Sequence, residues 1–286
     1  MDIFIYSLPM NLNTLIRFLL PRSIRNWLRK PGKSFEYVWD RVRFSLGETQ
    51  TVQVRDDWQP RCHPAARDHF EVFRTDPIQS SELDSFVQNC PDGIRLLDVG
   101  AHYGFFALAA LRYGGPKAQV ICVEASPGAA GILEVTLKLN ECTDRVRLMN
   151  VAMGDVDGVL PMLTTGPLGG DYFIVPTEQR SDTVLVPQRS LASLLAETGF
   201  RPTHLKMDIE GFEFEVIQAG LATLQELHPL IFLELHGTAL TARGKDPRAV
   251  IQMLQQAGYT QFTLGDEALT LEKMAGMGFN CRMICS

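Results

Sequence analysis

The sequence lacks the cysteine spacing of a disulfide-stapled or zinc-binding protein. Its six cysteines are scattered over 286 residues, and none forms a CxxC pair. Cys122 lies within an apolar run, where a cysteine is expected to act as a small buried hydrophobe. A chain of this kind is typical of a reducing compartment, and we predict a cytoplasmic protein.

Long apolar segments are also missing. No apolar run approaches the roughly 18–20 residues that span a bilayer. The first twenty residues have neither a basic start nor a small-residue cleavage site, so no signal peptide is predicted. The composition, 45% hydrophobic and 21% charged without low-complexity tracts, is that of a globular protein. The net charge of −6 argues against a dedicated nucleic-acid binder.

Positive charge is scarce except at the N-terminus. Residues 1–46 hold eight basic residues against three acidic ones, a net charge of +5, so the remainder carries −11. We interpret 1–46 as a basic amphipathic extension. It is either a solvated helical lead-in or an element that contacts an anionic membrane face or a protein partner. The basic residues are Arg17, Arg22, Arg25, Arg29, Lys30, Lys33, Arg41 and Arg43.

Beyond this extension the chain divides into a cap and a regular α/β domain. Residues 47–93 predict a helical cap with a helix at 81–89, and 94–286 alternate strand-length apolar runs with helix-period segments. A Gly/Pro-rich interruption at 154–187 predicts a β-hairpin insertion with a mobile tip near the active site. Strands are expected at 95–99, 119–124, 146–152, 204–208, 230–236, 259–264 and 281–285, and helices near 128–139, 211–219 and 246–257.

The run LLDVGAHYGFFAL, residues 96–108, predicts a strand, a glycine turn and a helix. Its DxGxxxG spacing matches neither the GxGxxG of dinucleotide folds nor the GxxxxGK[ST] of triphosphate sites. S-adenosylmethionine instead needs close backbone approach, a carboxylate for its ribose and an apolar slot for adenine. Gly100 and Gly104 allow that approach, Glu124 ends the second strand, and 150–152 can border the adenine. A purely structural turn and an ordinary strand-end acid are the alternatives.

Polar side chains end the fourth and fifth strands, where a buried parallel sheet should be apolar. Residues two apart share a face, so Lys206 and Asp208 point together, as do Glu234 and His236. An ion-pair network is one interpretation, with Glu210 and Glu213 at the N-terminus of the next helix. The other interpretation is a catalytic site. We favour it because these residues lie at the carboxyl ends of adjacent strands, where their side chains can meet.

In that catalytic interpretation, His236 or Asp208 takes the proton of the acceptor, and Lys206 and Glu234 position the acceptor or tune the pKa of the base. Asp, Glu and His are also ligands for a divalent metal. Ion pairing explains them equally well, and we predict no metal. The remaining histidines other than His102 are expected to be mostly surface or capping residues: His63, His69, His204 and His228.

Several segments occur in the order found in one family: LLDVGAHYGFFALAA, VEASPGAAGILEVTLKLN, NVAMGD, HLKMDIEGFEFEVIQAG and IFLELH. Residues 95–286 therefore resemble the FkbM S-adenosylmethionine-dependent methyltransferases. The resemblance implies the Rossmann-like class I methyltransferase fold, a seven-stranded, mostly parallel sheet with helices on both faces and an antiparallel last strand. It also implies O-methylation, often of a sugar or secondary metabolite. His102 departs from the Asn that many members carry.

We predict an O-methyltransferase that acts on a hydroxyl of a small molecule, sugar or secondary metabolite, with a small-molecule or glycan acceptor chosen by the cap and the insertion. A nicotinamide-dependent oxidoreductase and a non-catalytic methyltransferase-like binding module are the alternatives. The predicted catalytic residues are Lys206, Asp208, Glu234 and His236. The predicted contacts to S-adenosylmethionine are Asp98, Gly100, Ala101, His102, Gly104, Glu124, Ala125, Asn150, Ala152 and Asp208.

Overall fold

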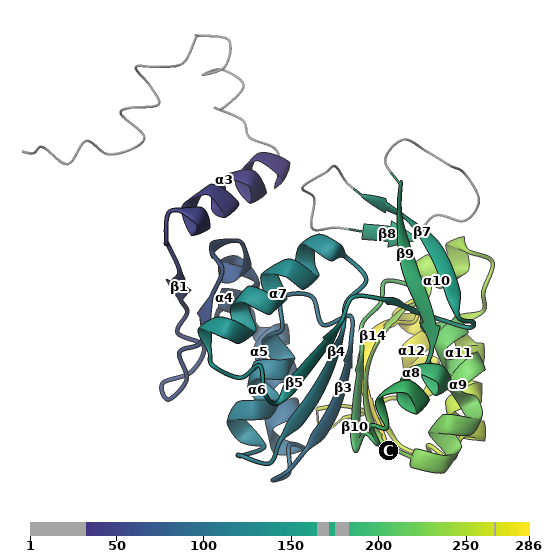
Figure 1. Cartoon of the computed structure of the whole chain (residues 1–286). Coiled ribbons are helices and arrows are strands. Elements are labelled where there is room, and N and C mark those ends of the chain that lie inside the picture. The colour runs from purple at the N-terminus through teal and green to yellow at the C-terminus, as the bar shows by residue number, and fades with distance from the viewer. Residues whose placement is uncertain (1–32, 165–171, 175–182, 266) are drawn as a thin grey trace, which may run out of the picture.

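A mixed eight-stranded sheet forms the centre of the molecule (Figure 1). The computed structural model describes residues 33–164, 172–174, 183–265 and 267–286. The strands lie in the order β13-β12-β14-β11-β10-β3-β4-β5. Their bounds are β3 Arg95–Val99, β4 Gln119–Val123, β5 Val146–Met149, β10 His204–Met207, β11 Leu230–His236, β12 Phe262–Leu264, β13 Glu267–Ala268 and β14 Asn280–Cys285.

The strand directions confirm the predicted class I methyltransferase fold. Strands β5, β4, β3, β10 and β11 are parallel neighbours, and the last strand, β14, runs antiparallel between β11 and β12. The predicted count of seven strands is one too few. The additional strand, β13, contributes two residues that pair with Thr263 and Leu264 of β12, so the chain folds back on itself at this sheet edge.

Helices cover both faces of the sheet, as predicted. Alternation along β3 places Leu96 in one hydrophobic core and Leu97 in the other. The first core is shared with α4, α5, α6 and α7, and the second with α8, α9, α11 and α12. Cys122 is fully buried in the first core, as expected. The helices are α6 Phe105–Tyr113, α7 Pro127–Leu139, α8 Leu191–Thr198, α9 Glu213–Leu227, α10 Gly237–Ala242, α11 Pro247–Gln256 and α12 Leu271–Gly276.

The cap is continuous with the first core. It comprises β1 Gln50–Thr51, β2 Arg61–Cys62, the 3-10 helix Pro64–Ala66, α4 Arg67–Thr75 and α5 Pro77–Gln88. The Phe73 ring stacks on Phe105 of α6 with centroids 3.6 Å apart. Helix α5 begins four residues before the predicted start because the Asp76 side chain caps the amides of Ile78 and Gln79 and Pro77 occupies the first turn.

The insertion is larger than the predicted hairpin. Strands β6 Ala152–Gly154, β7 Gly158–Thr164, β8 Tyr172–Ile174 and β9 Thr183–Ser190 form a second sheet in the order β6-β9-β7-β8 (Figure 1). The single strand expected at 146–152 is therefore split between two sheets. Asn150 lies at the break, where its side-chain amide donates to the carbonyls of Glu124 and Ala125. The predicted mobile tip lies outside the described residues.

The N-terminal extension is described only from α3, Lys33–Ser45. Arg43 in its last turn pairs with Asp40 at 3.2 Å and with Glu48. The rest of the predicted extension, residues 1–32, lies outside the described residues, so its contact with a membrane or partner stays a prediction. In the described part of the chain, no helix combines the length and apolarity needed to cross a membrane.

Candidate active site

A cavity of about 450 Å³ opens at the carboxyl ends of β3, β4, β10 and β11. Open α/β sheets bind their ligands at this edge. Its wall on the β3–β4 side includes Asp98, Gly100, Ala101, His102, Glu124, Ala125 and Ala152. Its wall on the β10–β11 side includes Lys206, Asp208, Glu210, Glu234 and Arg282, with His69, Phe73, Gln79 and Glu82 from the cap. We call the first wall the donor half, after the methyl donor predicted to bind there, and the second wall the acceptor half, after the predicted methyl acceptor.

The carboxylate of Glu124 is held in place by backbone amides. One oxygen accepts from the His102 amide and the other from the Ser126 amide, each at 2.7 Å. Burial raises the pKa of Glu124 to about 7, although these two amides oppose the rise. Each carboxylate oxygen retains a lone pair for a further donor, which fits a ribose diol.

Asp98 is the second acid of the donor half. It is 1% exposed, and its Oδ2 has no hydrogen-bond partner among the described residues. Burial raises its pKa to about 6 against the opposing charge of Lys206. A buried oxygen without a partner that lines a cavity is what a polar ligand group satisfies. The donor half therefore fits a cofactor that carries hydroxyl and amino groups.

The two predicted glycines have different roles. Gly100 has φ +84°, and a Cβ there would lie 1.8 Å from the carbonyl oxygen of Asp208, so the turn closes directly against the end of β10. A Cβ on Gly104 would lie 2.1 Å from Leu133 of α7. Gly104 is not part of the cavity wall, and its contact is with α7 rather than with a ligand.

Asn150 also lies outside the cavity wall. Its side chain is exposed, and the amide is already committed to the backbone carbonyls of Glu124 and Ala125. Its neighbour Ala152 does line the cavity, together with Met162 of the insertion. Asn150 therefore fixes the loop that carries Glu124, and the apolar wall comes from Ala152 and Met162.

Lys206 is the central cation of the acceptor half. It is 5% exposed, with its Nζ 3.6 Å from Asp208, 3.8 Å from Glu82 and 4.6 Å from the centre of the Phe106 ring. Burial acts to lower the pKa of Lys206, but the surrounding carboxylates outweigh it and raise the pKa. Lys206 is therefore a fixed positive charge beneath Asp208.

Asp208 and Glu234 form a carboxylate pair with opposite pKa shifts. Burial acts to raise the pKa of both. For Asp208 the charges of Lys206 and His236 outweigh burial, and its pKa is lowered. For Glu234 the negative charge of Asp208 adds to burial, and its pKa is raised despite Arg282 at 2.9 Å. Asp208 is thus the carboxylate of the pair that stays ionised.

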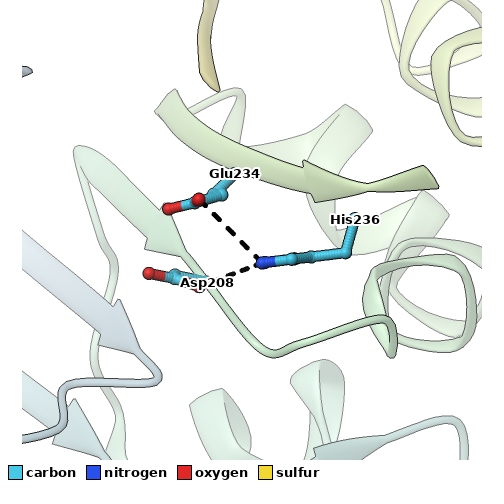
Figure 2. Close-up of side chains that lie close together, drawn as sticks. All are labelled: Asp208, Glu234 and His236. Atoms are coloured by element: carbon cyan, nitrogen blue, oxygen red, sulfur yellow. Dashed lines mark ion pairs between the residues drawn. The ribbon is translucent and has the colours of Figure 1, made fainter. Parts of the chain in front are cut away.

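His236 points toward this pair (Figure 2), but it is not one of the residues that line the cavity. Its Nδ1 lies 2.8 Å from the fully buried Glu213, and its Nε2 lies 3.7 Å from Asp208 and 3.5 Å from Glu210. Burial acts to lower the pKa of His236, but Glu213 and the other acids raise it to about 9. At neutral pH the ring is a cation, which favours Asp208 over His236 as the proton acceptor.

The same trio is a candidate metal site. Asp208, Glu234 and His236 each offer one ligand atom, all within 4.8 Å of one another (Figure 2). A metal requires a neutral histidine, whereas the described neighbours hold this one protonated. Lys206 and Arg282 also lie beside the two carboxylates. These cationic side chains already balance the negative charge of the two carboxylates. The absence of a metal stays our prediction.

Cap residues in the acceptor half were not found from the sequence. His69, expected to be a surface or capping residue, lines the cavity with its ring centroid 4.6 Å from that of His102, and burial lowers its pKa to about 3. Glu82 contacts both Lys206 and Arg282. His63 caps a 3-10 helix, as expected, but is buried. His204 is also buried, and His228 is the C-cap residue of α9. The residues from α4, α5 and β14 share no sequence motif, so their meeting in one cavity could not be predicted from their spacing in the sequence.

Residues 98–260 match the family model of the methyltransferase FkbM domain. No curated protein matches the chain. Among solved structures, the methyltransferase FkbM of Methylobacillus flagellatus KT is 16% identical with a TM-score of 0.46, and the alignment covers 68% of this chain and 43% of that one. The chain thus spans less than half the length of that protein.

Two further solved structures cover nearly the whole chain at low identity. A putative O-methyltransferase from Klebsiella pneumoniae is 12% identical with a TM-score of 0.42, and the O-methyltransferase of Bacillus cereus in complex with SAH is 11% identical with a TM-score of 0.39. Both alignments cover 96% of this chain and 94% of the other. The family match covers more than half of the sequence. The chain therefore belongs to the FkbM methyltransferase family, and its cofactor is S-adenosylmethionine.

Proposed function

We propose that this protein is an O-methyltransferase that acts on a hydroxyl of a small molecule, a sugar or another secondary metabolite. One observation carries the proposal: a single cavity joins the donor half, with Glu124 and the unpartnered Asp98 oxygen, to the ionised Asp208. A methyl donor and a hydroxyl can therefore meet beside a carboxylate.

The donor half holds the cofactor through few groups. Glu124 accepts hydrogen bonds from the ribose hydroxyls, and Asp98 accepts from a polar group of the methionine portion. Ala152 and Met162 border the adenine. When bound, S-adenosylmethionine supplies a methyl group already activated on a sulfonium. The protein must then align the acceptor, a contribution of up to roughly 7–11 kcal/mol in favourable cases.

The acceptor half orients the hydroxyl and removes its proton. Asp208 is about one-third exposed to the cavity and accepts the proton as the oxygen gains the methyl group. Lys206 and His236 are positioning residues, because their charges keep Asp208 ionised. Glu234 lines the same wall and positions the acceptor beside Asp208. Proton removal of this kind contributes about 10²–10⁴-fold to a rate.

The two alternatives have less support. The family match argues against a nicotinamide-dependent oxidoreductase. A binding module has no need of an ionised carboxylate beside the donor pocket, held there by buried Lys206 at 3.6 Å. The cavity as a whole lies within the usual range of about 300–1,000 Å³ for small-molecule sites, and it would hold the cofactor together with a small-molecule or glycan acceptor.

A screen of hydroxylated metabolites and glycans tests the proposal. The purified chain is incubated with S-adenosylmethionine and each acceptor, and S-adenosylhomocysteine is measured together with the position of the new methyl group in the product. We expect methylation at oxygen for at least one acceptor. Methylation at nitrogen or carbon would overturn the O-methyl assignment. Binding of S-adenosylmethionine without turnover across the panel would favour the binding module.

A further inference from the structure

A second cavity of about 240 Å³ lies between α5 and the strands β11, β14 and β12. Its wall is mostly apolar and includes Ile78, Phe232, Leu264, Met283 and Ile284. We call this cavity the α5 groove. It is smaller than the roughly 300–1,000 Å³ typical of a complete ligand site, so its size suits part of a ligand.

The α5 groove adjoins the acceptor half of the active site, and the two cavities share part of their walls. Glu82 and Arg282 line both cavities, and they pair with each other at 3.2 Å. The guanidinium of Arg282 also lies 2.9 Å from Glu234. One ion pair thus forms the boundary between a polar cavity and an apolar one.

Strand alternation explains why the two cavities share a face. Residues two apart point the same way, so Phe232 lies beside Glu234 on β11, and Ile284 lies beside Arg282 on β14. The register places Phe232 opposite Ile284 and Glu234 opposite Arg282. Along this face the sheet therefore changes within one step from a charged pair to an apolar pair. A ligand that reaches from the active site into the α5 groove therefore passes the ion pair of Glu82 and Arg282.

The open side of the α5 groove exposes large apolar side chains. Ile78 is 65% exposed and Leu264 is 43% exposed. Both side chains line the α5 groove, so its mouth presents apolar surface to water. Covering them with an apolar group removes that surface from water and is favourable.

We propose that the α5 groove binds an apolar chain of the acceptor, so that the substrate is amphipathic. Its hydroxyl-bearing head lies in the acceptor half, and an alkyl or aryl tail lies along α5 against Phe232 and Ile284. Glu82 and Arg282 contact the junction of head and tail. The proposal rests on the proposed function, because the head is the group that is methylated.

A series of alkyl β-D-glucopyranosides tests the tail separately from the chemistry. The dissociation constants of the methyl, butyl, hexyl and octyl glucosides are measured on the full chain with S-adenosylhomocysteine present, below micellar concentrations. Each fully buried methylene should tighten binding about fourfold. The octyl glucoside should bind on the order of a hundredfold more tightly than the methyl glucoside, as expected if about half of its added methylenes are buried in the groove. Equal affinities across the series would overturn the proposal.

Matched variants locate the tail. Leu264→Glu and Ile78→Glu should each reduce the octyl-to-methyl affinity ratio about tenfold. Leu271→Glu is the control, because Leu271 is equally exposed at 44% but lies on α12 outside the groove. A ratio that falls equally in all three variants, or in none, would overturn the proposal. The proposal would also be overturned if all the glucosides bound the wild type with equal affinity and Leu264→Glu converted a dimer into a monomer. The groove would then be a contact between subunits.

The readout distinguishes this inference from the proposed function. Binding is measured without turnover, so chain-length dependence in a protein that methylates no hydroxyl supports the groove and overturns only the proposed chemistry. Methylation of hydroxyls with equal affinity for short and long glucosides overturns only the groove.

Discussion

The donor and acceptor halves of the cavity are built in different ways. In the donor half, Glu124 is held by two backbone amides, and Asp98 keeps an oxygen without a described partner. In the acceptor half, Asp208 and Glu234 are surrounded by the charged side chains of Lys206, Arg282 and His236. The first is a backbone scaffold with open hydrogen-bonding capacity, and the second is a charge network.

This difference matches the demands of the two ligands. A constant cofactor can be recognised by backbone amides and a few acids that follow β3 and β4. An acceptor must be oriented and must lose a proton, which requires side chains whose charges set each other's pKa. We expect substitutions in the donor half to change cofactor affinity and substitutions in the acceptor half to change turnover.

The largest effect should come from Asp208→Asn. The variant keeps the shape of the side chain but removes the charge that accepts the proton. With an acceptor found by the screen, kcat should fall about 10²–10⁴-fold, while the dissociation constant for S-adenosylmethionine stays within a fewfold. Asp56→Asn, an exposed position in the cap, is the control and should keep full turnover. Full turnover in Asp208→Asn would remove Asp208 from the mechanism.

Glu124→Gln should act on cofactor affinity. Hydrogen bonds to a charged group contribute about 1.5–3 kcal/mol, so the dissociation constant for S-adenosylmethionine should rise about 10–100-fold. Because burial raises the pKa of Glu124 to about 7, wild-type affinity should increase as the pH rises through 7 and the carboxylate ionises. The variant should lose this dependence. Glu134→Gln, an exposed pair partner of Lys138, should retain it.

The charge on His236 should appear in the pH dependence of stability. Its folded pKa of about 9 lies above the ordinary 6.5, so its stabilisation is complete below pH 6.5 and is lost as the pH rises through 9. At about 1.4 kcal/mol per pKa unit, reduced for partial solvent screening, this amounts to about 2 kcal/mol. Urea unfolding at pH 6 and pH 10 should show this loss in the wild type and not in His236→Asn. Parallel pH profiles would mean that His236 is neutral.

The smallest effect should follow metal removal. Lys206, Arg282 and His236 already neutralise the carboxylates that a divalent ion would bind. Exhaustive chelation should therefore leave kcat and the melting temperature unchanged. Loss of turnover on chelation, restored by a divalent cation, would show that the trio in Figure 2 is a metal site.

The donor half could largely be predicted from the sequence because its parts are close in the chain. The turn after β3 and the end of β4 bring Asp98, Gly100 and Glu124 to one edge of the sheet by strand order alone. Gly104 and Asn150 show the limit of that reasoning. Both lie in the right segments, yet Gly104 contacts α7 and Asn150 contacts backbone carbonyls, so a motif does not reveal which way a residue faces.

In the acceptor half, the sequence predicted only the charged residues at the carboxyl ends of β10 and β11. Asp208 and Glu234 interrupt buried apolar runs, which made them visible. His69, Glu82 and Arg282 come from α4, α5 and β14, up to about 200 residues apart in the chain, and each reads alone as an ordinary surface residue. Only tertiary packing reveals that they share one cavity. The insertion was predicted as a hairpin, and β7 does pair antiparallel with β8 and β9, but the larger sheet was not predicted because it depends on the pairing of β6 with β9.

Calorimetric titration of S-adenosylmethionine into the wild type, Glu124→Gln and Asp208→Asn tests most directly the division of the cavity into a donor half and an acceptor half. We expect Glu124→Gln to weaken binding at least about tenfold and Asp208→Asn to bind within a fewfold of the wild type. Equal weakening in both variants would contradict this division, because the two carboxylates would then belong to one cofactor site.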